Sequence, residues 1–203
     1  HKRICEINTS GSLKSIKFDN NNYKYNLIII CTGRNSSLVK NIFKNQIIEN
    51  SYKETSITTI LHHDSIKNNV ARQFFLDNGI LALLPISNTR TSIVWSVKKD
   101  IKKKNDLLIK KKIKFYTKNY LKNITFTSKI ERQNLNFLIR NKYYQDRILL
   151  FGDALHVVHP FVGQSFNMTL RDLVCLEKVL NKKINLGLDI GSSDILYEFS
   201  SET

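Results

Sequence analysis

The sequence predicts an α/β fold from three features: short apolar strands that end in glycine turns, a meander of alternating strands, and a long amphipathic helix that begins at a glycine loop. With 203 residues, 41% of them hydrophobic, the chain is long enough to bury a core and to form one or two domains. We find no stretch of 18 consecutive apolar residues and therefore expect a globular protein.

The amino-terminal part contains one strand that is expected to be buried. Residues 27–31 form an apolar run that enters a Thr-Gly loop, and a polar turn at 19–22 lies upstream, inside a segment that we expect to form an extended pair. A buried strand followed by glycine is typical of a sheet that binds a ligand at the carboxyl ends of its strands.

The middle of the chain has the pattern of a meander followed by a helix. A turn at Asp77-Asn78-Gly79 separates two alternating runs, and a third run follows a short loop. Apolar residues then recur at helical spacing between Lys98 and Lys122, with lysines between them, which predicts a helix with a solvated basic face. The expected strands are 71–76, 80–86, 91–97 and 137–140, and the apolar helix positions are Ile109, Ile113, Tyr116 and Tyr120.

A second buried strand leads into the most informative turn. Residues 148–151 form a continuous apolar run, which predicts a strand buried on both faces of a sheet. Gly152 allows a tight turn and a close approach of a ligand, and Asp153 places a carboxylate at the end of the strand.

The long helix is expected to begin at Gly163-Gln164-Ser165. Its apolar positions keep the spacing of an amphipathic helix, and they are Phe166, Leu170, Leu173, Val174 and Leu180. The first amides of a helix have no partner within it, and the helix dipole adds roughly half a positive charge there. The amino end of this helix therefore favours an anionic or electron-rich group.

The stretch GDALHVVHPFVGQSFNMTLRDL (152–173) resembles the GDAAHxxHPxxGQGxNxGxxD signature of the FAD-dependent aromatic hydroxylases related to para-hydroxybenzoate hydroxylase, most closely their ubiquinone-biosynthesis branch. Three further stretches resemble this family in the expected order, at 25–36, 79–97 and 186–200. The resemblance implies the carboxyl-terminal portion of a Rossmann-like FAD-binding domain with an inserted mixed-sheet substrate domain. We expect FAD-binding segments at 1–40 and 144–203, and the substrate domain at 41–143.

The resemblance also implies a cofactor site. Gly152 and Asp153 would hold the ribityl chain of FAD, and Gly33 belongs to a second motif of the family. The loop and helix start would lie against the flavin ring, with the amides near Phe166 and Asn167 facing its pyrimidine edge. The residues of that segment are Pro160, Gly163, Gln164, Ser165, Phe166 and Asn167.

The implied activity is hydroxylation of a polyprenylated phenol with NADPH or NADH as reductant and O2 as co-substrate. Because the cofactor carries out the difficult chemistry, we assign no side chain as a catalytic acid or base. A related aromatic hydroxylase with a different phenolic substrate is an alternative within the same class.

Some positions depart from the family pattern. Thr32 stands where the family has aspartate, Leu155 where it has alanine, and Ser165 where it has glycine. The chain also lacks a G-x-G-x-x-G turn, so we interpret it as a partial sequence that lacks about 120 to 150 residues. These departures leave open a degenerate flavin-fold protein that binds a ligand or partner without turnover.

Composition argues against other classes of partner. Thirty-two Lys and Arg against 17 Asp and Glu give a net charge of +15, but lysine is spread along the chain without a nucleic-acid motif, so we expect no nucleic-acid partner. The basic residues could instead serve a partner. The alternatives to a solvated surface are attraction to anionic lipids, as in a peripheral protein at an inner membrane, and contact with a biosynthetic complex. Three scattered cysteines predict no disulfide framework and fit a reducing cytoplasm.

For several polar and aromatic residues, we favour an ordinary surface or core position over a functional role. Asp153, His156 and His159 have a spacing that suggests a metal, but Pro160 argues against a rigid ligand face, and we expect no metal site. We expect surface positions for His62 and His63, and sheet-core positions for Phe74, Phe75 and Trp95.

Overall fold

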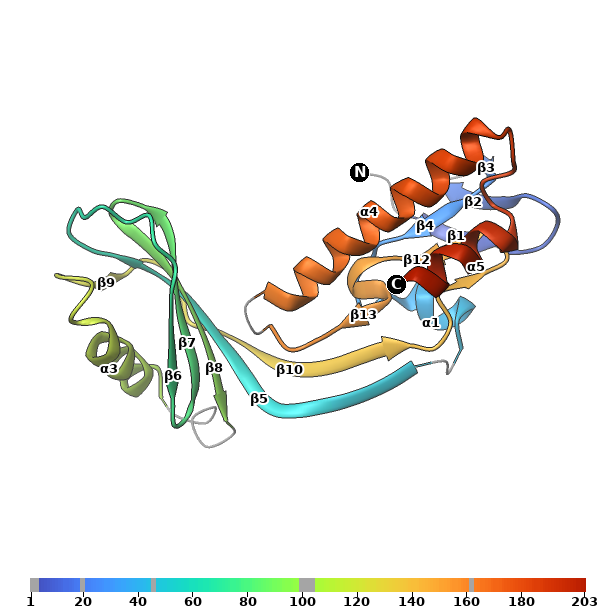
Figure 1. The fold of residues 1–203 in the computed structure, drawn as a ribbon. Helices are drawn as coiled ribbons and strands as arrows, with labels where there is room; N and C mark the ends of the chain where they lie inside the picture. Colours follow the sequence, from blue (N-terminus) through green and yellow to red (C-terminus); the bar gives the residue numbers. More distant parts are fainter. Residues whose placement is uncertain (1–3, 19–20, 45–46, 99–104, 161–162) are drawn as a thin grey trace. The chain divides into compact units, whose positions relative to one another are not determined.

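A computed structural model describes residues 4–18, 21–44, 47–98, 105–160 and 163–203. The chain forms two compact units (Figure 1). Unit 1 comprises His1–Asn50 and Asn136–Thr203, and unit 2 comprises Ser51–Leu135. The chain thus passes between the units at 50/51 and 135/136, where the sequence suggested 40/41 and 143/144.

Unit 1 is built around a pair of short parallel strands. Its antiparallel meander has the order β1-β2-β3, its second sheet has the order β11-β12-β4, and helices and a 3₁₀ turn complete it. The elements are β1 (Ile4–Asn8), β2 (Lys14–Phe18), β3 (Asn21–Tyr25), β4 (Ile28–Ile30), α1 (Ser37–Ile42), β11 (Tyr144–Gln145), β12 (Ile148–Leu150), η1 (Gly152–Ala154), β13 (His156–Val157), α4 (Gln164–Asn185) and α5 (Ser193–Glu202). Of the turn expected at 19–22, residues 19 and 20 lie outside the described part.

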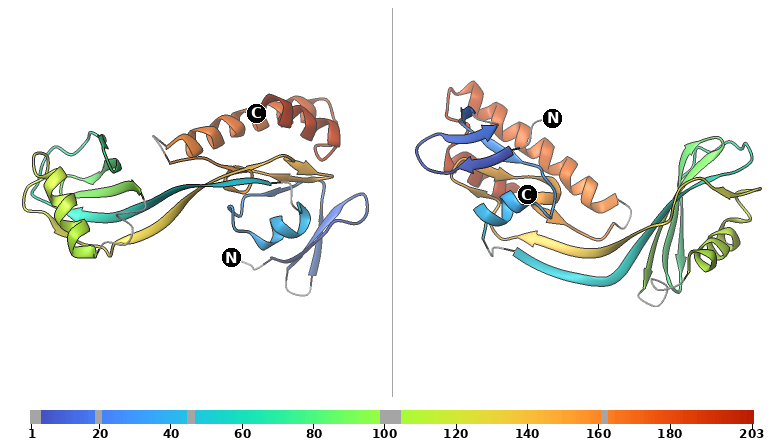
Figure 2. Two further views of the ribbon diagram at one scale, coloured as in Figure 1. Left: turned by 90° about the horizontal axis from the view of Figure 1, so that it is seen from below. Right: turned by 180° about the vertical axis from the view of Figure 1, so that it is seen from behind.

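The central strand β12 is buried on both faces, as the sequence predicted. Ile148 and Leu150 pack in one core cluster with β4 and α1, whereas Leu149 packs in another with α4 and α5. Figure 2 shows α4 and α5 on one side of this strand pair and α1 with the meander on the other. Because β12 and β4 are parallel, their carboxyl ends meet at one edge, and the amide of Phe151 donates to the carbonyl of Ile30 over 3.0 Å.

Helix α4 begins at Gly163 as predicted, but the face that it buries is not the apolar face seen in the sequence. The buried side chains are Asp172, Leu176 and Val179, which face the rest of unit 1. Four of the five apolar positions seen in the sequence are exposed instead, from 44% at Leu170 to 67% at Phe166, and the fifth, Leu180, is half-buried. The pattern therefore located the helix and its apolar face correctly but not the surface against which the helix packs.

The segment after α4 is held to β4 by a cluster of polar contacts. Arg147 makes two hydrogen bonds to the Asp189 carboxylate, at 2.8 and 2.5 Å, and a third to the carbonyl of Asn26. The amide of Gly191 also donates to Asp189. These contacts lower the pKa of Asp189 to about 2, and the hydrogen bond from Arg147 makes the largest contribution.

The lowered pKa of Asp189 predicts a pH dependence of stability. A carboxyl with a folded-state pKa of about 2 and an ordinary unfolded value stabilises the fold fully above about pH 4, and this contribution is lost as pH falls toward 2. The Asp189→Asn variant should therefore be less stable than the parent at pH 6, and the difference should shrink between about pH 4 and pH 2. Urea titrations across this range test it, and a difference that does not change with pH would contradict it.

Unit 2 is an antiparallel sheet with one helix on it. The sheet order is β13-β10-β5-β8-β7-β6, in which β13 belongs to unit 1, and β9 pairs with β5. The elements are β5 (Ile47–His62), β6 (Arg72–Leu76), β7 (Gly79–Ser87), β8 (Arg90–Lys98), α3 (Asp106–Thr117), β9 (Thr125–Phe126) and β10 (Glu131–Arg140), where β5 and β10 continue into unit 1. The three meander strands expected between 71 and 97 are present, and the hairpin turn lies at 77–78 as predicted.

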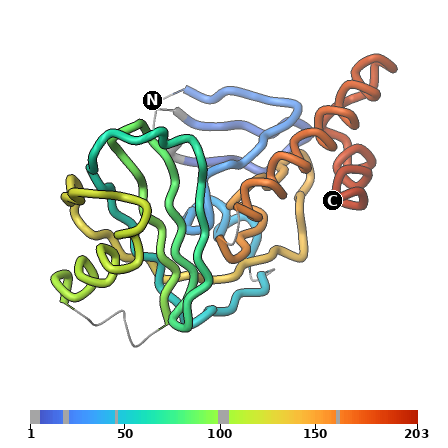
Figure 3. Tube along the Cα trace, turned by 60° about the vertical axis from the view of Figure 1, so that its left-hand side comes forward, coloured from blue at the N-terminus to red at the C-terminus, as the bar shows by residue number. Residues whose placement is uncertain are grey.

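The basic helix is confirmed as α3, and residues 99–104 of the expected segment lie outside the described part. The side chain of its N-cap, Asn105, accepts a hydrogen bond from the amide of Leu107 at 3.2 Å. Ile109 and Ile113 are fully buried in the core of unit 2, together with Trp95 of β8. Figure 3 shows α3 at the margin of this unit with the sheet on one side of it.

Two side-chain expectations in unit 2 are wrong. His63 is buried, not on the surface. Both of its ring nitrogens have hydrogen-bond partners there: Nε2 lies 2.8 Å from the Thr91 hydroxyl, and Nδ1 lies 2.8 Å from the carbonyl oxygen of Asp64. Phe75 is 71% exposed, because alternation along β6 turns it away from the face that carries Phe74. Trp95 and Phe74 do belong to the core. A search of the described helices finds none that is long and apolar enough to cross a membrane.

Candidate functional site

Two glycine turns of unit 1 follow the parallel strands β4 and β12, and the second of them lies against helix α4. Gly33 lies in the loop after β4, and Gly152 follows β12, so both lie at the carboxyl edge of the parallel pair. Gly152 also lies against α4, since a Cβ placed on it would be 3.7 Å from the Thr169 methyl carbon. The φ angles of Gly33, Gly152 and Gly163 are +77°, +60° and +68°, a region that favours glycine.

The turn at η1 exposes one carboxylate. Asp153 is exposed between buried Gly152 and Ala154, so the turn holds the backbone in the core while the side chain stays accessible. The sequence predicted this arrangement from the Gly-Asp pair at a strand end. A carboxylate in this position can accept hydrogen bonds from hydroxyl groups of a ligand.

The amino end of α4 offers backbone donors without an internal competitor. Its N-cap, Gly163, provides no side-chain cap, and the first turn contains no acidic residue. Gln164, Phe166 and Asn167 are exposed, and Ser165 is half-buried. The hydroxyl of Ser165 is buried and has no hydrogen-bond partner among the residues that the structure describes. Pro160 before this turn is exposed, and residues 161–162 lie outside the described part.

These features fit a large cofactor with hydroxyl, anionic and aromatic parts. The space next to Gly33 and Gly163 is open, because a Cβ on either residue would meet no atom of the described chain within 4 Å. The donors are backbone amides at a positive helix end, the acceptor is a carboxylate, and Phe166 adds an exposed aromatic surface.

Buried polar contacts behind the turn hold its shape. The Arg140 side chain is 2% exposed and donates from Nε to the carbonyl of Ala154 at 2.7 Å, while its amide donates to the carbonyl of Leu155 at 3.1 Å. Burial lowers the pKa of Arg140, and the Glu49 carboxylate opposes that shift. Arg140 thus fixes the carboxyl end of η1.

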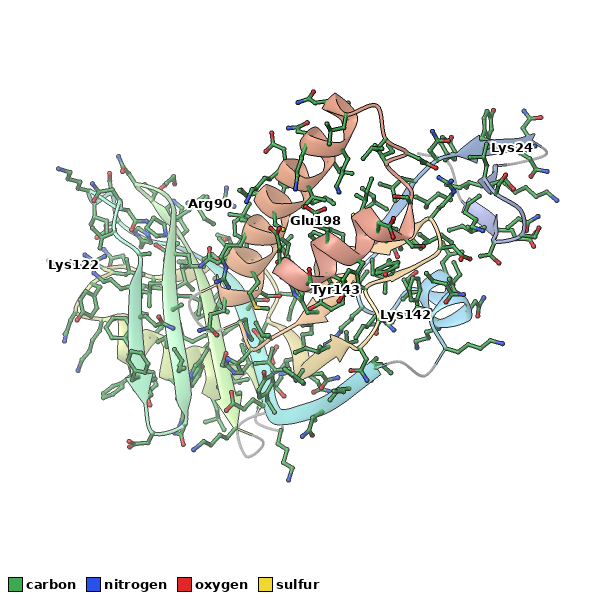
Figure 4. All side chains as sticks on the ribbon, turned by 45° about the vertical axis from the view of Figure 1, so that its right-hand side comes forward. Lys24, Arg90, Lys122, Lys142, Tyr143 and Glu198 are labelled. Carbon is green, nitrogen blue, oxygen red and sulfur yellow. The ribbon has the colours of Figure 1, made fainter. Side chains whose placement is uncertain are left out.

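His156 and Asp172 form a second buried contact. His156 Nε2 lies 2.6 Å from Asp172 Oδ2, and the two side chains are 6% and 9% exposed. The pair joins β13, directly after the Gly-Asp turn, to the middle of α4. Nearby, burial and then the Asp172 charge raise the pKa of Tyr143, which Figure 4 labels beside α5.

The sequence had suggested His156 only as part of a metal spacing. The structure instead turns His156 into the core toward Asp172, while Asp153 is exposed. Among the described residues, no three His, Cys, Asp or Glu side chains lie together as metal ligands would. Neither Arg140 nor the His156–Asp172 pair was predicted, because both depend on how β10, β13 and α4 pack.

Unit 2 contributes a separate surface, the face of its sheet opposite α3. Register places Ala82 and Thr58 on either side of Val94, and Leu84 and Ile60 on either side of Ser92. These side chains alternate with the core residues that α3 covers, so they point to the other face. They are half-buried or exposed, and together they form an open sheet face of aliphatic and hydroxyl side chains.

Comparisons with known proteins identify the family of the chain. Residues 22–190 match a family described as the FAD binding domain. The chain is 28% identical over 216 residues to the ubiquinone biosynthesis monooxygenase COQ6 of Xenopus tropicalis, covering 87% of the chain and 46% of that protein. It is also 28% identical over 167 residues to the ubiquinone hydroxylase UbiL of Rhodospirillum rubrum, covering 74% of the chain and 36% of that protein.

Solved structures show the same fold at low identity. PqsL of Pseudomonas aeruginosa, a probable FAD-dependent monooxygenase, superposes with a TM-score of 0.77 at 16% identity, covering 99% of the chain and 58% of that protein. The flavin-dependent halogenase CmlS gives a TM-score of 0.73 at 11% identity, covering 98% of the chain and 38% of that protein.

The chain spans about half the length or less of the curated relatives that it matches. Both the predicted fold and the predicted resemblance to the ubiquinone-biosynthesis branch are confirmed. Since the matched region includes all the glycine segments described above, the chain belongs to the FAD binding domain family.

Proposed function

We propose that this chain is part of an FAD-dependent monooxygenase that hydroxylates a polyprenylated phenol in ubiquinone biosynthesis, with NADPH or NADH as reductant and O2 as co-substrate. The observation that carries the proposal is that Gly33 and the pair Gly152-Asp153 follow two parallel strands at one edge of unit 1, with Thr169 of α4 packed against Gly152. The ubiquinone-biosynthesis names of the relatives favour the substrate class.

Each part of the site has a role in this proposal. Asp153 would accept hydrogen bonds from the ribityl hydroxyls, and Gly33 and Gly152 would let the backbone come close to the cofactor. The amides near Phe166 and Asn167 would face the pyrimidine edge of the ring, where the helix dipole would stabilise negative charge. FAD bound there would supply the redox chemistry: with two electrons from the nicotinamide donor, one atom of O2 would enter the electron-rich ring and the other would leave as water.

The open sheet face of unit 2, around Ala82, Val94 and Thr58, is the proposed wall for the phenol. Aliphatic side chains there bury an apolar ring and tail, and hydroxyl groups such as that of Ser92 offer hydrogen bonds to ring oxygens. Orientation of the substrate and exclusion of water are the tasks of this surface, and no side chain of it is assigned as an acid or base.

The alternative of a degenerate, non-catalytic protein is weakened by Leu155. This side chain, larger than the alanine of the family pattern, is fully buried in the core with Ile28 and Ile30, so its bulk does not enter the turn. Thr32 is exposed, and Ser165 keeps its backbone amide at the helix start. A related hydroxylase with another phenolic substrate stays a second candidate, since the sheet face fits other apolar phenols.

The Asp153→Ala variant tests the cofactor site. A hydrogen bond to a charged acceptor contributes about 1.5–3 kcal/mol, so the FAD dissociation constant should rise by about 10- to 150-fold. The matched control is Asp77→Ala, which removes an exposed carboxylate from a hairpin turn in unit 2. Fluorescence titration of the apoprotein, produced from its complete coding sequence, measures both. Equal affinity in the parent and the Asp153→Ala protein would contradict the assignment.

A further inference from the structure

Helix α3 has an outward face that no other part of the described chain uses. At 100° per residue, six side chains fall on one side of this helix, and all six are exposed: Leu107, Leu108, Lys111, Lys114, Phe115 and Lys118. We call these six residues the α3 outer face. Large apolar and basic side chains alternate on it.

The apolar members of this face are not part of the core. Ile109, Ile113 and Thr117, on the opposite side of α3, are fully buried against the sheet of unit 2. Leu107, by contrast, is 66% exposed, and Phe115 is 62% exposed. A helix that only needed solvation on its outer side would not require three large apolar groups there.

The charge around the α3 outer face is predominantly positive. Residues 106–123 contain six lysines and a single carboxylate, Asp106, which is paired with Arg132. Lys118 lies 4.8 Å from the Phe115 ring centroid, so a cation sits directly beside the exposed aromatic group. Figure 4 shows Lys122, just beyond the helix, at the margin of unit 2.

We propose that the α3 outer face docks on an anionic lipid surface. Lysines attract anionic headgroups, and exposed Leu and Phe side chains on the same helix face enter the boundary between headgroups and acyl chains. An acidic protein would satisfy the lysines but would not by itself explain Leu107, Leu108 and Phe115 at the outermost positions. The proposal goes beyond the flavin chemistry, and it would place the protein where a polyprenylated molecule resides.

Vesicle sedimentation tests the proposal with the protein made from its complete coding sequence. Vesicles of phosphatidylcholine with phosphatidylglycerol should bind the parent, and vesicles of phosphatidylcholine alone should bind it weakly. The triple variant K111Q/K114Q/K118Q should lower the partition coefficient at least about 30-fold, since each lysine near an anionic surface contributes about tenfold or less. L107S/F115S should lower it about tenfold or more at unchanged charge.

The matched control is K17Q/K24Q/K40Q, which removes the same charge from exposed lysines of unit 1. This control should retain most of the binding. Equal losses in the two triple variants would show attraction by net charge alone and would overturn the proposal, as would failure of the parent to bind anionic vesicles. A dimer that L107S/F115S dissociates, without vesicle binding, would assign the face to a second copy instead. Flavin content, measured on the same samples, separates this outcome from failure of the proposed function.

Discussion

Replacing His156 with leucine is expected to destabilise unit 1 by about 3–5 kcal/mol, because it leaves the Asp172 carboxylate buried without its partner. The 2.6 Å contact is the one hydrogen bond found for the Asp172 side chain in the described chain. Leucine keeps much of the volume of the imidazole, so a cavity contributes little to the loss. The contact also joins β13 to α4, so the η1 turn just before β13 should loosen with it.

A double variant separates the buried charge from packing. In H156L/D172L both polar groups are gone, and most of the lost stability should return, because an apolar pair of similar volume can replace a buried ionic pair. The control is His62→Leu, an exposed residue at the end of β5, which should change stability by less than about 0.5 kcal/mol. Urea unfolding measures all three, and a loss below about 1 kcal/mol for H156L would contradict the account.

Gly191→Ala is expected to cost about 3 kcal/mol for a steric reason. Gly191 is buried, and a Cβ on it would overlap the backbone oxygen of Asn26 and lie 2.5 Å from Arg147 Nη1. The carbonyl of Asn26 belongs to the backbone just before β4 and cannot move without disturbing that strand. The substitution should therefore displace the segment that Asp189 and Arg147 hold.

Gly187→Ala, four residues earlier, is the matched comparison. Gly187 has a φ of +68°, and a Cβ on it would meet no atom of the described chain within 4 Å. This variant should therefore lose only about 1 kcal/mol, the cost of a left-handed backbone in a residue with a side chain. The difference between the two variants isolates the overlap at Gly191. Similar unfolding midpoints for both would show that the segment after α4 adapts freely.

Much of the fold was predictable because strand and helix periods are local signals. The run at 148–151, the hairpin around Gly79 and the start of α4 at Gly163 all appear where the sequence placed them. The face that an element buries is not local information. In α4 the sequence shows an apolar stripe around Phe166, yet the described chain buries Asp172 and Leu176 on the other side.

The glycine positions of the candidate site were predictable because they lie in one continuous signature. The groups that hold the turn were not, since Arg140 reaches Ala154 across 14 residues and His156 reaches Asp172 across 16. The boundaries of unit 2 could not be predicted either, because each of them lies within a continuous strand, β5 or β10.

The absorbance spectrum of the protein, produced from its complete coding sequence, tests the central claim most directly. We predict a bound-flavin spectrum that NADPH or NADH bleaches without oxygen and that air restores, faster when a prenylated phenol is present. Folded protein that retains no flavin after incubation with FAD, or bound flavin that neither nicotinamide donor reduces, would contradict the monooxygenase account.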